Sequence, residues 1–125
     1  MIGDKYFLKF TLPNIGVLEG EIKRLKGPHL TELIMKSLPL TSRGLKRDKL
    51  FIIPINTVYS VERPTKQGER GNIIYDPQSK SLIIVLQTTK FDNVVGNLGS
   101  INKNLELLDA LKMSSGVRIE KSDSA

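Results

Sequence analysis

Short runs of alternating apolar and polar residues make up most of this chain, and turn-forming residues separate them. In the run that begins at Asp4, Tyr6, Leu8 and Phe10 fall on one face, whereas Lys9 falls on the other. An alternation with a period of two is typical of a β-strand that buries one face. Runs of this kind at intervals of about 8–12 residues indicate a mainly β fold, either a barrel or a sandwich.

The same pattern continues along the chain and predicts strands over residues 4–12, 17–24, 50–61, 72–75, 81–86, 91–101 and 116–121. The turn residues Pro13 to Gly16 join the first two into a hairpin. Pro54 has no amide hydrogen to donate, so it predicts an edge strand or a bulge within residues 50–61. Residues 41–49 read as a loop or a short ragged strand, and residues 64–71 as a polar loop.

Two segments change from the strand period to the helical one. Apolar residues recur at helical spacing within residues 28–38, with Pro28 at a first-turn position and Pro39 as the stop. A leucine stripe predicts a second helix over residues 102–112, with Asn102 as a suitable N-cap. If the strands form a barrel, these two helices would cap its ends.

The 125 residues are 39 % hydrophobic and 26 % charged, which is ordinary globular usage. We expect a single domain over residues 1–121 and a frayed tail over residues 122–125. No apolar run approaches the ~18 residues of a membrane span, and Lys5 and Lys9 argue against a signal peptide. The prediction is therefore a cytoplasmic protein without membrane contact.

Few catalytic arrangements are compatible with this composition. There is no cysteine, and His29 is the single histidine, so we predict no metal site and no cofactor, and interpret His29 as structural or simply exposed. No Gly-x-Ser-x-Gly motif is present, and the glycines at 96 and 99 lack the Lys-Ser/Thr of a phosphate loop. Glu19 and Glu21 alternate with apolar residues, which is typical of a solvated strand face.

Positive charge is concentrated in the first part of the chain. Lys and Arg number 19 against 13 acidic residues, and the net charge of +6 arises entirely before residue 71. Such asymmetry is typical of a chain with an anionic partner, here RNA or the ribosome, although a solvated charged rim fits the same pattern. No adjacent aromatic pair of the kind that stacks bases accompanies the basic residues. The candidate anion contacts are Lys23, Arg24, Lys26, Arg43, Lys46, Arg47, Lys49 and Arg70.

The segment Arg70-Gly71-Asn72-Ile73-Ile74-Tyr75-Asp76-Pro77, followed by the apolar run 82–86, resembles the cyclophilin-like family of small archaeal and bacterial proteins. That family usually has Asp where Asn72 stands, and a Gly/Thr-Pro segment where this chain has residues 87–89. Further similarities occur in the same order from about residue 16 to residue 121. They lie at residues 16–21, 38–39, 53–55, 95–99, 105–111 and 116–119.

The resemblance implies a closed barrel of about eight strands that two short helices cap. It also implies a small-ligand or peptide-binding domain, since the arginine and phenylalanine-lined proline pocket of active cyclophilins cannot be mapped onto this sequence. The predicted groove residues are Arg43, Phe51, Tyr59, Arg63, Tyr75 and Phe91. A peptidyl-prolyl isomerase and an RNA- or ribosome-associated module are the alternatives. The protein would be a monomer, or a homodimer through the strand edge at Pro54.

Overall fold

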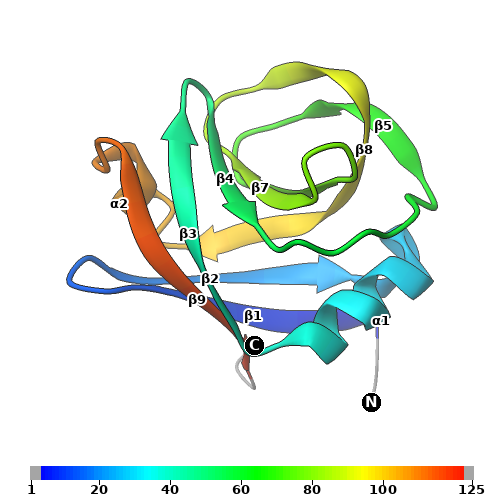
Figure 1. The fold of residues 1–125 in the computed structure, drawn as a ribbon, viewed down its shortest axis with the longest axis horizontal. Helices are drawn as coiled ribbons and strands as arrows, with labels where there is room; N and C mark the ends of the chain where they lie inside the picture. Colours follow the sequence, from blue (N-terminus) through cyan, green and yellow to red (C-terminus); the bar gives the residue numbers. More distant parts are fainter. Residues whose placement is uncertain (1–3, 123–125) are drawn as a thin grey trace.

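Strands that hydrogen-bond around a full circle form the body of the molecule. The structure is a computed structural model that describes residues 4–122, and within that range an antiparallel barrel of eight strands closes by pairing β2 with β8 (Figure 1). Around the barrel the order is β2 (Gly16–Lys23), β1 (Lys5–Leu12), β9 (Ser114–Ser122), β3 (Leu40–Arg47), β4 (Leu50–Pro54), β7 (Ser81–Val85), β6 (Asn72–Asp76) and β8 (Thr89–Lys103). The predicted mainly β barrel is confirmed.

Closure depends on a close approach of β2 to β8. Gly20 is paired with Ile101 and Ile22 with Gly99, and the register shifts between Glu19 and Gly20. A Cβ atom on Gly99 would lie 1.9 Å from the backbone oxygen of Glu21. Only glycine therefore allows the two strands to pair at this point.

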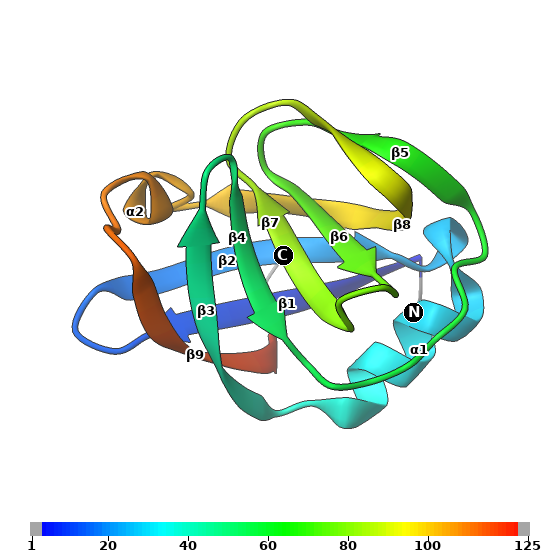
Figure 2. The same cartoon turned by 45° about the horizontal axis from the view of Figure 1, so that its top comes forward.

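The two helices close the barrel interior at different sides of the molecule (Figure 2). Helix α1 (Pro28–Ser37), which follows the one-turn 3₁₀ helix η1 (Arg24–Lys26), contributes Leu30 and Ile34 to the central hydrophobic cluster. Helix α2 (Glu106–Asp109) contributes Leu108 to the same cluster. This arrangement is the capping that the sequence predicted.

A second apolar cluster lies outside the barrel wall. Ile74, Ile83, Val85 and Val95 are buried together, and Phe91 packs against them. The first half of β8 and the extra strand β5 (Pro64–Gly68), which pairs only with β8, curl over this face (Figures 1 and 2). Strand β7 is consequently buried on both faces, which explains its uninterrupted apolar sequence.

Four local predictions were wrong. The strand predicted over residues 50–61 ends at Pro54. Residues predicted as a loop or ragged strand form the regular strand β3, and the predicted polar loop at 64–71 contains β5. The predicted helix over 102–112 shrinks to the four residues of α2 because β8 continues through Asn102 to Lys103, which pairs with Glu19 of β2. Pairing with a neighbouring strand thus overrides the local helical pattern.

The strand at Pro54 is paired on one side only. Strand β4 pairs with β7 from Leu50 to Pro54, which lies opposite Ser81, but it pairs with β3 only from Leu50 to Ile52. On the β3 side the carbonyl of Pro54 accepts the hydroxyl of Ser42 at 2.6 Å. A full strand edge in the described part of the sheet belongs to β5, where Pro64, Lys66 and a register shift all discourage further pairing. Monomer or homodimer stays a prediction.

The chain ends also differ slightly from expectation. Ser122 is the last residue of β9 and pairs with Phe7, so it belongs to the barrel and not to the predicted tail. Residues 123–125 lie outside the described residues. Between residues 4 and 122, no helix has the length and apolar character needed to cross a membrane.

Replacing Gly99 by Ala tests the closure. We expect G99A to lower the free energy of unfolding by at least about 2 kcal/mol, because the new methyl group collides with backbone that cannot move without breaking the β2–β8 pairing. The matched control is G116A, since a Cβ on Gly116 meets nothing closer than 3.9 Å and should change stability by less than about 1 kcal/mol. Urea unfolding measures both, and equal stability of the two variants would contradict this account.

Candidate ligand-binding site

A groove of about 470 Å³ separates α1 from the extended segment that links β4 to β5. This size is within the range of about 300–1,000 Å³ that is usual for small-molecule pockets. The lining residues come from one turn and a half of α1 and from residues 58–62. They are His29, Leu30, Leu33, Val58, Tyr59, Ser60 and Glu62.

Apolar side chains form most of the groove surface. Leu30 is buried, but Leu33 is 40 % exposed and Val58 is 69 % exposed. Large aliphatic side chains at this exposure leave apolar area in contact with water, and a ligand that covers it gains about 25 cal/mol for each Å² buried. The groove therefore favours a ligand with an apolar group.

Tyr75 anchors the outer wall of the groove from inside the core. Its ring is fully buried, its hydroxyl donates to the backbone oxygen of Thr57 at 2.5 Å, and the same hydroxyl accepts from the amide of Tyr59 at 3.1 Å. Burial raises the pKa of Tyr75, so its hydroxyl remains a neutral donor at physiological pH. The rings of Tyr59 and Tyr75 also pack with centroids 5.9 Å apart.

Two contacts across the groove fix the distance between its walls. The carboxylate of Glu62 accepts the backbone amides of His29 at 2.8 Å and Leu30 at 2.9 Å, so it caps the start of α1 from another part of the chain. The hydroxyl of Tyr59 donates to the backbone oxygen of Leu33 at 3.3 Å. The groove is therefore formed before any ligand arrives.

The backbone of the outer wall is largely unpaired. Val58, Ser60 and Val61 make no hydrogen bond to any other residue in the described range. The segment is extended but belongs to no sheet. Its amides and carbonyls are free to bond a ligand.

Of the predicted groove residues, only the two tyrosines belong to this site. Tyr59 lines the groove and Tyr75 holds its wall. Phe51 is fully buried in the barrel core, where its ring occupies the space that a side chain at Gly44 would need. Phe91 belongs to the outer cluster instead.

The two predicted arginines lie elsewhere. Arg43 is exposed on β3 and donates to the hydroxyl of Ser114 at 3.1 Å. Because Phe51 faces the core, it lies on the opposite side of the barrel wall from the exposed Arg43 side chain. Arg63 follows Glu62 in sequence but lines a different pocket, beside η1.

The basic residues divide between the two ends of β2. Leu107 of the α2 region lies over Gly16, the first residue of β2, and the ammonium of Lys46 donates to the backbone oxygens of Asp109 and Leu111 at 2.8 and 2.9 Å. Lys23 is the last residue of β2, so at ~3.3 Å per residue it lies about 23 Å from Gly16.

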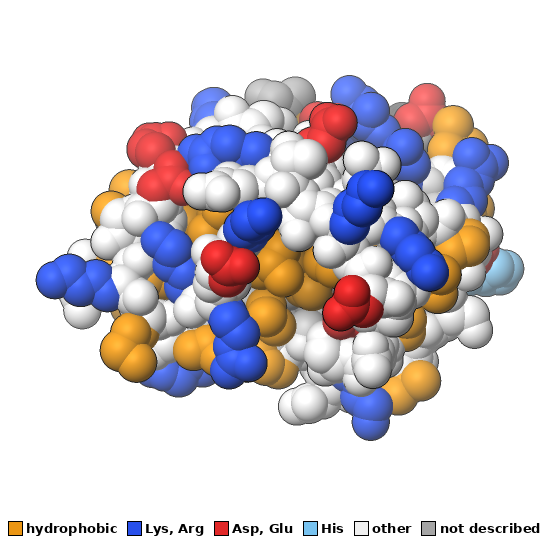
Figure 3. All heavy atoms as spheres, turned by 90° about the horizontal axis from the view of Figure 1, so that it is seen from above, with side chains coloured by type: hydrophobic (Ala, Val, Ile, Leu, Met, Phe, Trp, Pro, Cys, Tyr) orange, Lys and Arg blue, Asp and Glu red, His pale blue; other side chains and the backbone are white. Residues whose placement is uncertain are grey.

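Arg24 and Lys26 continue from Lys23 in η1, whereas Arg70 joins Lys46 at the α2 end. Arg47 and Lys49 lie at and just beyond the end of β3, next to Lys46. On the face that Figure 3 shows, Lys and Arg side chains are spread among acidic ones, with apolar side chains between them. Seven of the eight candidate anion contacts therefore form two separate groups, and Arg43 lies in the middle of β3.

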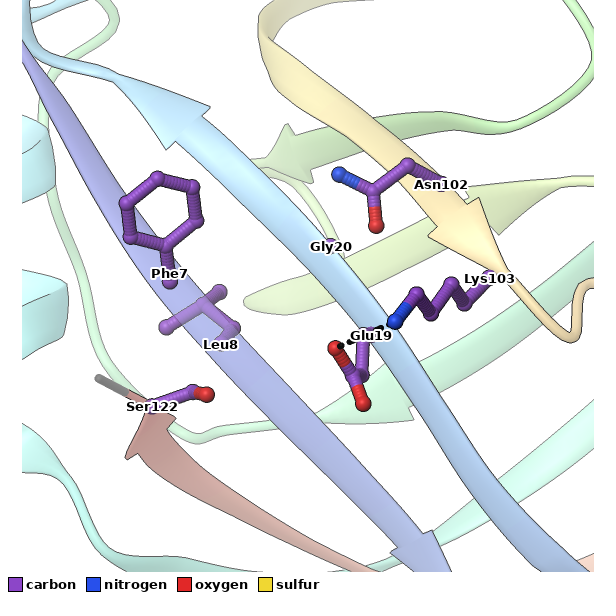
Figure 4. A pocket seen from close by; sticks show the side chains of 7 residues that line it. All are labelled: Phe7, Leu8, Glu19, Gly20, Asn102, Lys103 and Ser122. Atoms are coloured by element: carbon purple, nitrogen blue, oxygen red, sulfur yellow. Dashed lines mark ion pairs between the residues drawn. The ribbon is translucent and has the colours of Figure 1, made fainter. Parts of the chain in front are cut away.

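Another pocket, of about 230 Å³, opens where the β2–β8 register shifts (Figure 4). Glu19 and Lys103 face each other across it with 3.9 Å between charged atoms, and Asn102 is the extra residue of the bulge. Phe7 on β1 completes one wall. Its charges are paired, so the groove beside α1 is the better candidate site.

Several groove residues escaped the sequence analysis. Leu33 belongs to the apolar repeat that predicted α1, and nothing in that repeat sets it apart from the buried Leu30, although it is 40 % exposed. Val58 lies in the run that was predicted as a strand over residues 50–61, so its exposure was not foreseen. The capping role of Glu62 has no local signal because its partners are about 30 residues away.

The comparisons with known proteins support the fold. No protein-family model and no curated protein matches the sequence. Among solved structures, the hypothetical protein AF2241 from Archaeoglobus fulgidus matches with a TM-score of 0.78 and 16 % identity, over 96 % of this chain and 97 % of that one. The structure of McbB in complex with tryptophan matches with a TM-score of 0.77 and 13 % identity, over 94 % of this chain but only 45 % of McbB.

At these identities the likeness shows a shared barrel fold. The resemblance to the cyclophilin-like family is thus supported in its architecture, a closed eight-stranded barrel with two short helices. Membership of that family stays a prediction.

Removing the Tyr75 hydroxyl should loosen the groove wall. We expect Y75F to lower the free energy of unfolding by about 1–3 kcal/mol, because the amide of Tyr59 and the carbonyl of Thr57 both lose their partner. Hydrogen exchange at Tyr59 should accelerate. The control Y59F removes only the exposed 3.3 Å bond to Leu33 and should change stability by less than about 0.5 kcal/mol; a larger loss in Y59F than in Y75F would refute the anchoring role.

The ion pair of Arg70 with Asp109 should give a small pH dependence. Its closest atoms are 2.7 Å apart, and the hydrogen bond from Arg70 holds the pKa of Asp109 below its usual value. The stabilisation is therefore present above the ordinary carboxyl pKa, near 3.8, and disappears as the pH falls through the lower folded-state pKa.

Both side chains are nearly half-exposed, so the contribution should not exceed about 1 kcal/mol. Urea midpoints of the wild type and D109N, measured from pH 7 to pH 3, should differ at neutral pH and converge in acid. A difference that grows in acid would contradict the assignment.

Proposed function

We propose that this chain is a non-catalytic binding domain that holds an apolar group of a small ligand or an extended peptide in the groove beside α1. The observation that carries the proposal is the preformed groove of about 470 Å³ with the exposed side chains of Leu33 and Val58. The hydrogen bonds of Glu62 with His29 and of Tyr59 with Leu33 fix the distance between its walls in the absence of a ligand. Binding therefore costs little reorganisation.

An extended peptide suits the outer wall best. Val58, Ser60 and Val61 offer unpaired amides and carbonyls along an extended segment, which a second extended chain can bond in the manner of an added strand. Side chains alternate along such a peptide, so every second one would point into the groove. Backbone bonds would supply orientation, and the apolar side chain would supply most of the affinity.

The solved structures are consistent with ligand binding by this fold. The McbB structure holds tryptophan, a small molecule with an apolar aromatic side chain. A ligand of that kind has the size and character that the groove favours. This likeness concerns the fold, so it supports the proposal without locating the site.

A peptidyl-prolyl isomerase is the less favoured alternative. Phe51, one of the predicted groove residues, is buried in the core against Gly44, and the exposed side chain of Arg43 lies on the other side of the barrel wall. Neither an arginine nor a phenylalanine is among the described residues that line the groove.

The groove can be tested by NMR titration with free tryptophan and with a panel of extended peptides that carry Leu, Phe or Trp. We expect methyl shifts at Leu33 and Val58 and at least a tenfold weaker affinity in V58E, because a carboxylate would replace exposed apolar surface. The matched control is M113E, since Met113 is also exposed but lies by Lys46 at the α2 end. Shifts elsewhere, or equal binding by V58E, would refute the site.

The same protein should be assayed for acceleration of proline-limited refolding. We expect no acceleration, because the groove lacks the arginine and phenylalanine arrangement. Acceleration that V58E abolishes would replace the binding proposal by the isomerase.

A further inference from the structure

Two pockets meet at the η1 end of the barrel and share Lys23 and Lys26. The larger, of about 340 Å³, is also lined by Asp4, Lys5, Leu25 and Arg63. The smaller, of about 140 Å³, is also lined by Asn72, Asn97, Gly99 and Ser100. They lie apart from the groove described above, whose lining includes none of these residues.

Most of the cations here have no intramolecular partner. Lys5 forms an ion pair with Glu21 at 3.4 Å. The side chains of Lys23, Lys26 and Arg63 form neither an ion pair nor a hydrogen bond with any residue between 4 and 122. Asp4 is the acidic residue that lines the larger pocket, and no acidic residue lines the smaller one.

Hydrogen-bond donors also dominate the smaller pocket. The side-chain oxygen of Asn72 accepts the amide of Glu69 at 2.8 Å and the Nδ2 of Asn97 at 3.1 Å. These two bonds orient the Asn72 amide and leave its Nδ2 without a protein partner. The hydroxyl of Ser100, opposite Asn72 in the β6–β8 pairing, is likewise unused.

The backbone of Gly99 forms part of the wall of the smaller pocket. The β6–β8 register shifts between Ile73 and Ile74, so Leu98 is the extra residue of β8 there, and its side chain is buried in the core. On either side of these two residues, Asn97 and Ser100 line the pocket with polar side chains.

We propose that this corner binds a small organic phosphate, with the phosphate in the smaller pocket and the body of the molecule in the larger one. Two lysine ammonium groups, an amide Nδ2 and a hydroxyl are donors that a phosphate oxygen prefers. Leu25, which is 67 % exposed, and the aliphatic stems of the lysines give the body an apolar surface. Arg63 lines the larger pocket, where its guanidinium would bond a second polar group of the ligand.

The start of α1 does not compete for this phosphate. The amides of His29 and Leu30 already bond the carboxylate of Glu62, so the helix offers no free N-terminal donors there. The side chains of Lys23 and Lys26 therefore carry the recognition.

The test uses inorganic phosphate and adenosine 5′-monophosphate as probes in NMR titrations at low and high salt. Both probes should shift Asn72, Ser100 and Lys23, and the nucleotide should also shift Leu25. The double variant K23Q/K26Q should bind the nucleotide at least tenfold more weakly, and affinity should fall with salt in the wild type. No shift at this corner, or unchanged binding by the variant, would overturn the proposal.

The control K112Q/K121Q removes the same charge from exposed positions elsewhere and should bind normally. V58E should also bind phosphate normally, so this proposal and the groove can fail independently. A uridylate decamer tests the alternative hypothesis that this protein binds RNA. Two results together would replace the small-phosphate site by an RNA surface. The decamer would bind far more tightly than the monophosphate, and K46Q/R47Q at the other end would weaken decamer binding as much as K23Q/K26Q does.

Discussion

The pairing of β2 with β8 converts an open sheet into a barrel, and most of the other features depend on it. Gly99 permits the approach, because any side chain there would overlap the backbone of Glu21. Once the barrel is closed, its two ends need covers, and the apolar sides of α1 and α2 supply them. Gly99 also lines the smaller pocket beside η1, together with Asn97 and Ser100. The residue that permits closure of the barrel is therefore also part of a candidate binding surface.

Tyr75 connects that core to the groove. Its ring packs in the central cluster, while its hydroxyl bonds the backbone of Thr57 and Tyr59 in the linker between β4 and β5. A linker of this length without regular structure would ordinarily be mobile. Burying the anchor in the core makes the linker part of the rigid structure and leaves its backbone free for a ligand.

The sequence predicts the parts of the fold in which each strand has one solvent-exposed and one buried apolar face. Strand β1 and helix α1 follow their patterns closely. Strand β3 was missed because its inward positions are Ser42, Gly44 and Lys46, where apolar residues were expected. The inward position 44 is occupied by glycine because the ring of Phe51 fills the space in front of it, so the apolar group that completes the pattern comes from the next strand. A single strand's pattern cannot contain that information.

The candidate sites were harder to predict for a related reason, since each joins residues that are distant in sequence. Glu62 bonds the amide of His29 across the groove, and Lys23 and Asn72 line the same small pocket beside η1. The linker shows how the two sites are related. At its β5 end the linker bends, and its neighbouring residues Glu62 and Arg63 line different surfaces, the groove beside α1 and the larger pocket beside η1. The Tyr75 anchor therefore fixes the shared wall of two surfaces, one apolar and one basic, that flank the same helix start.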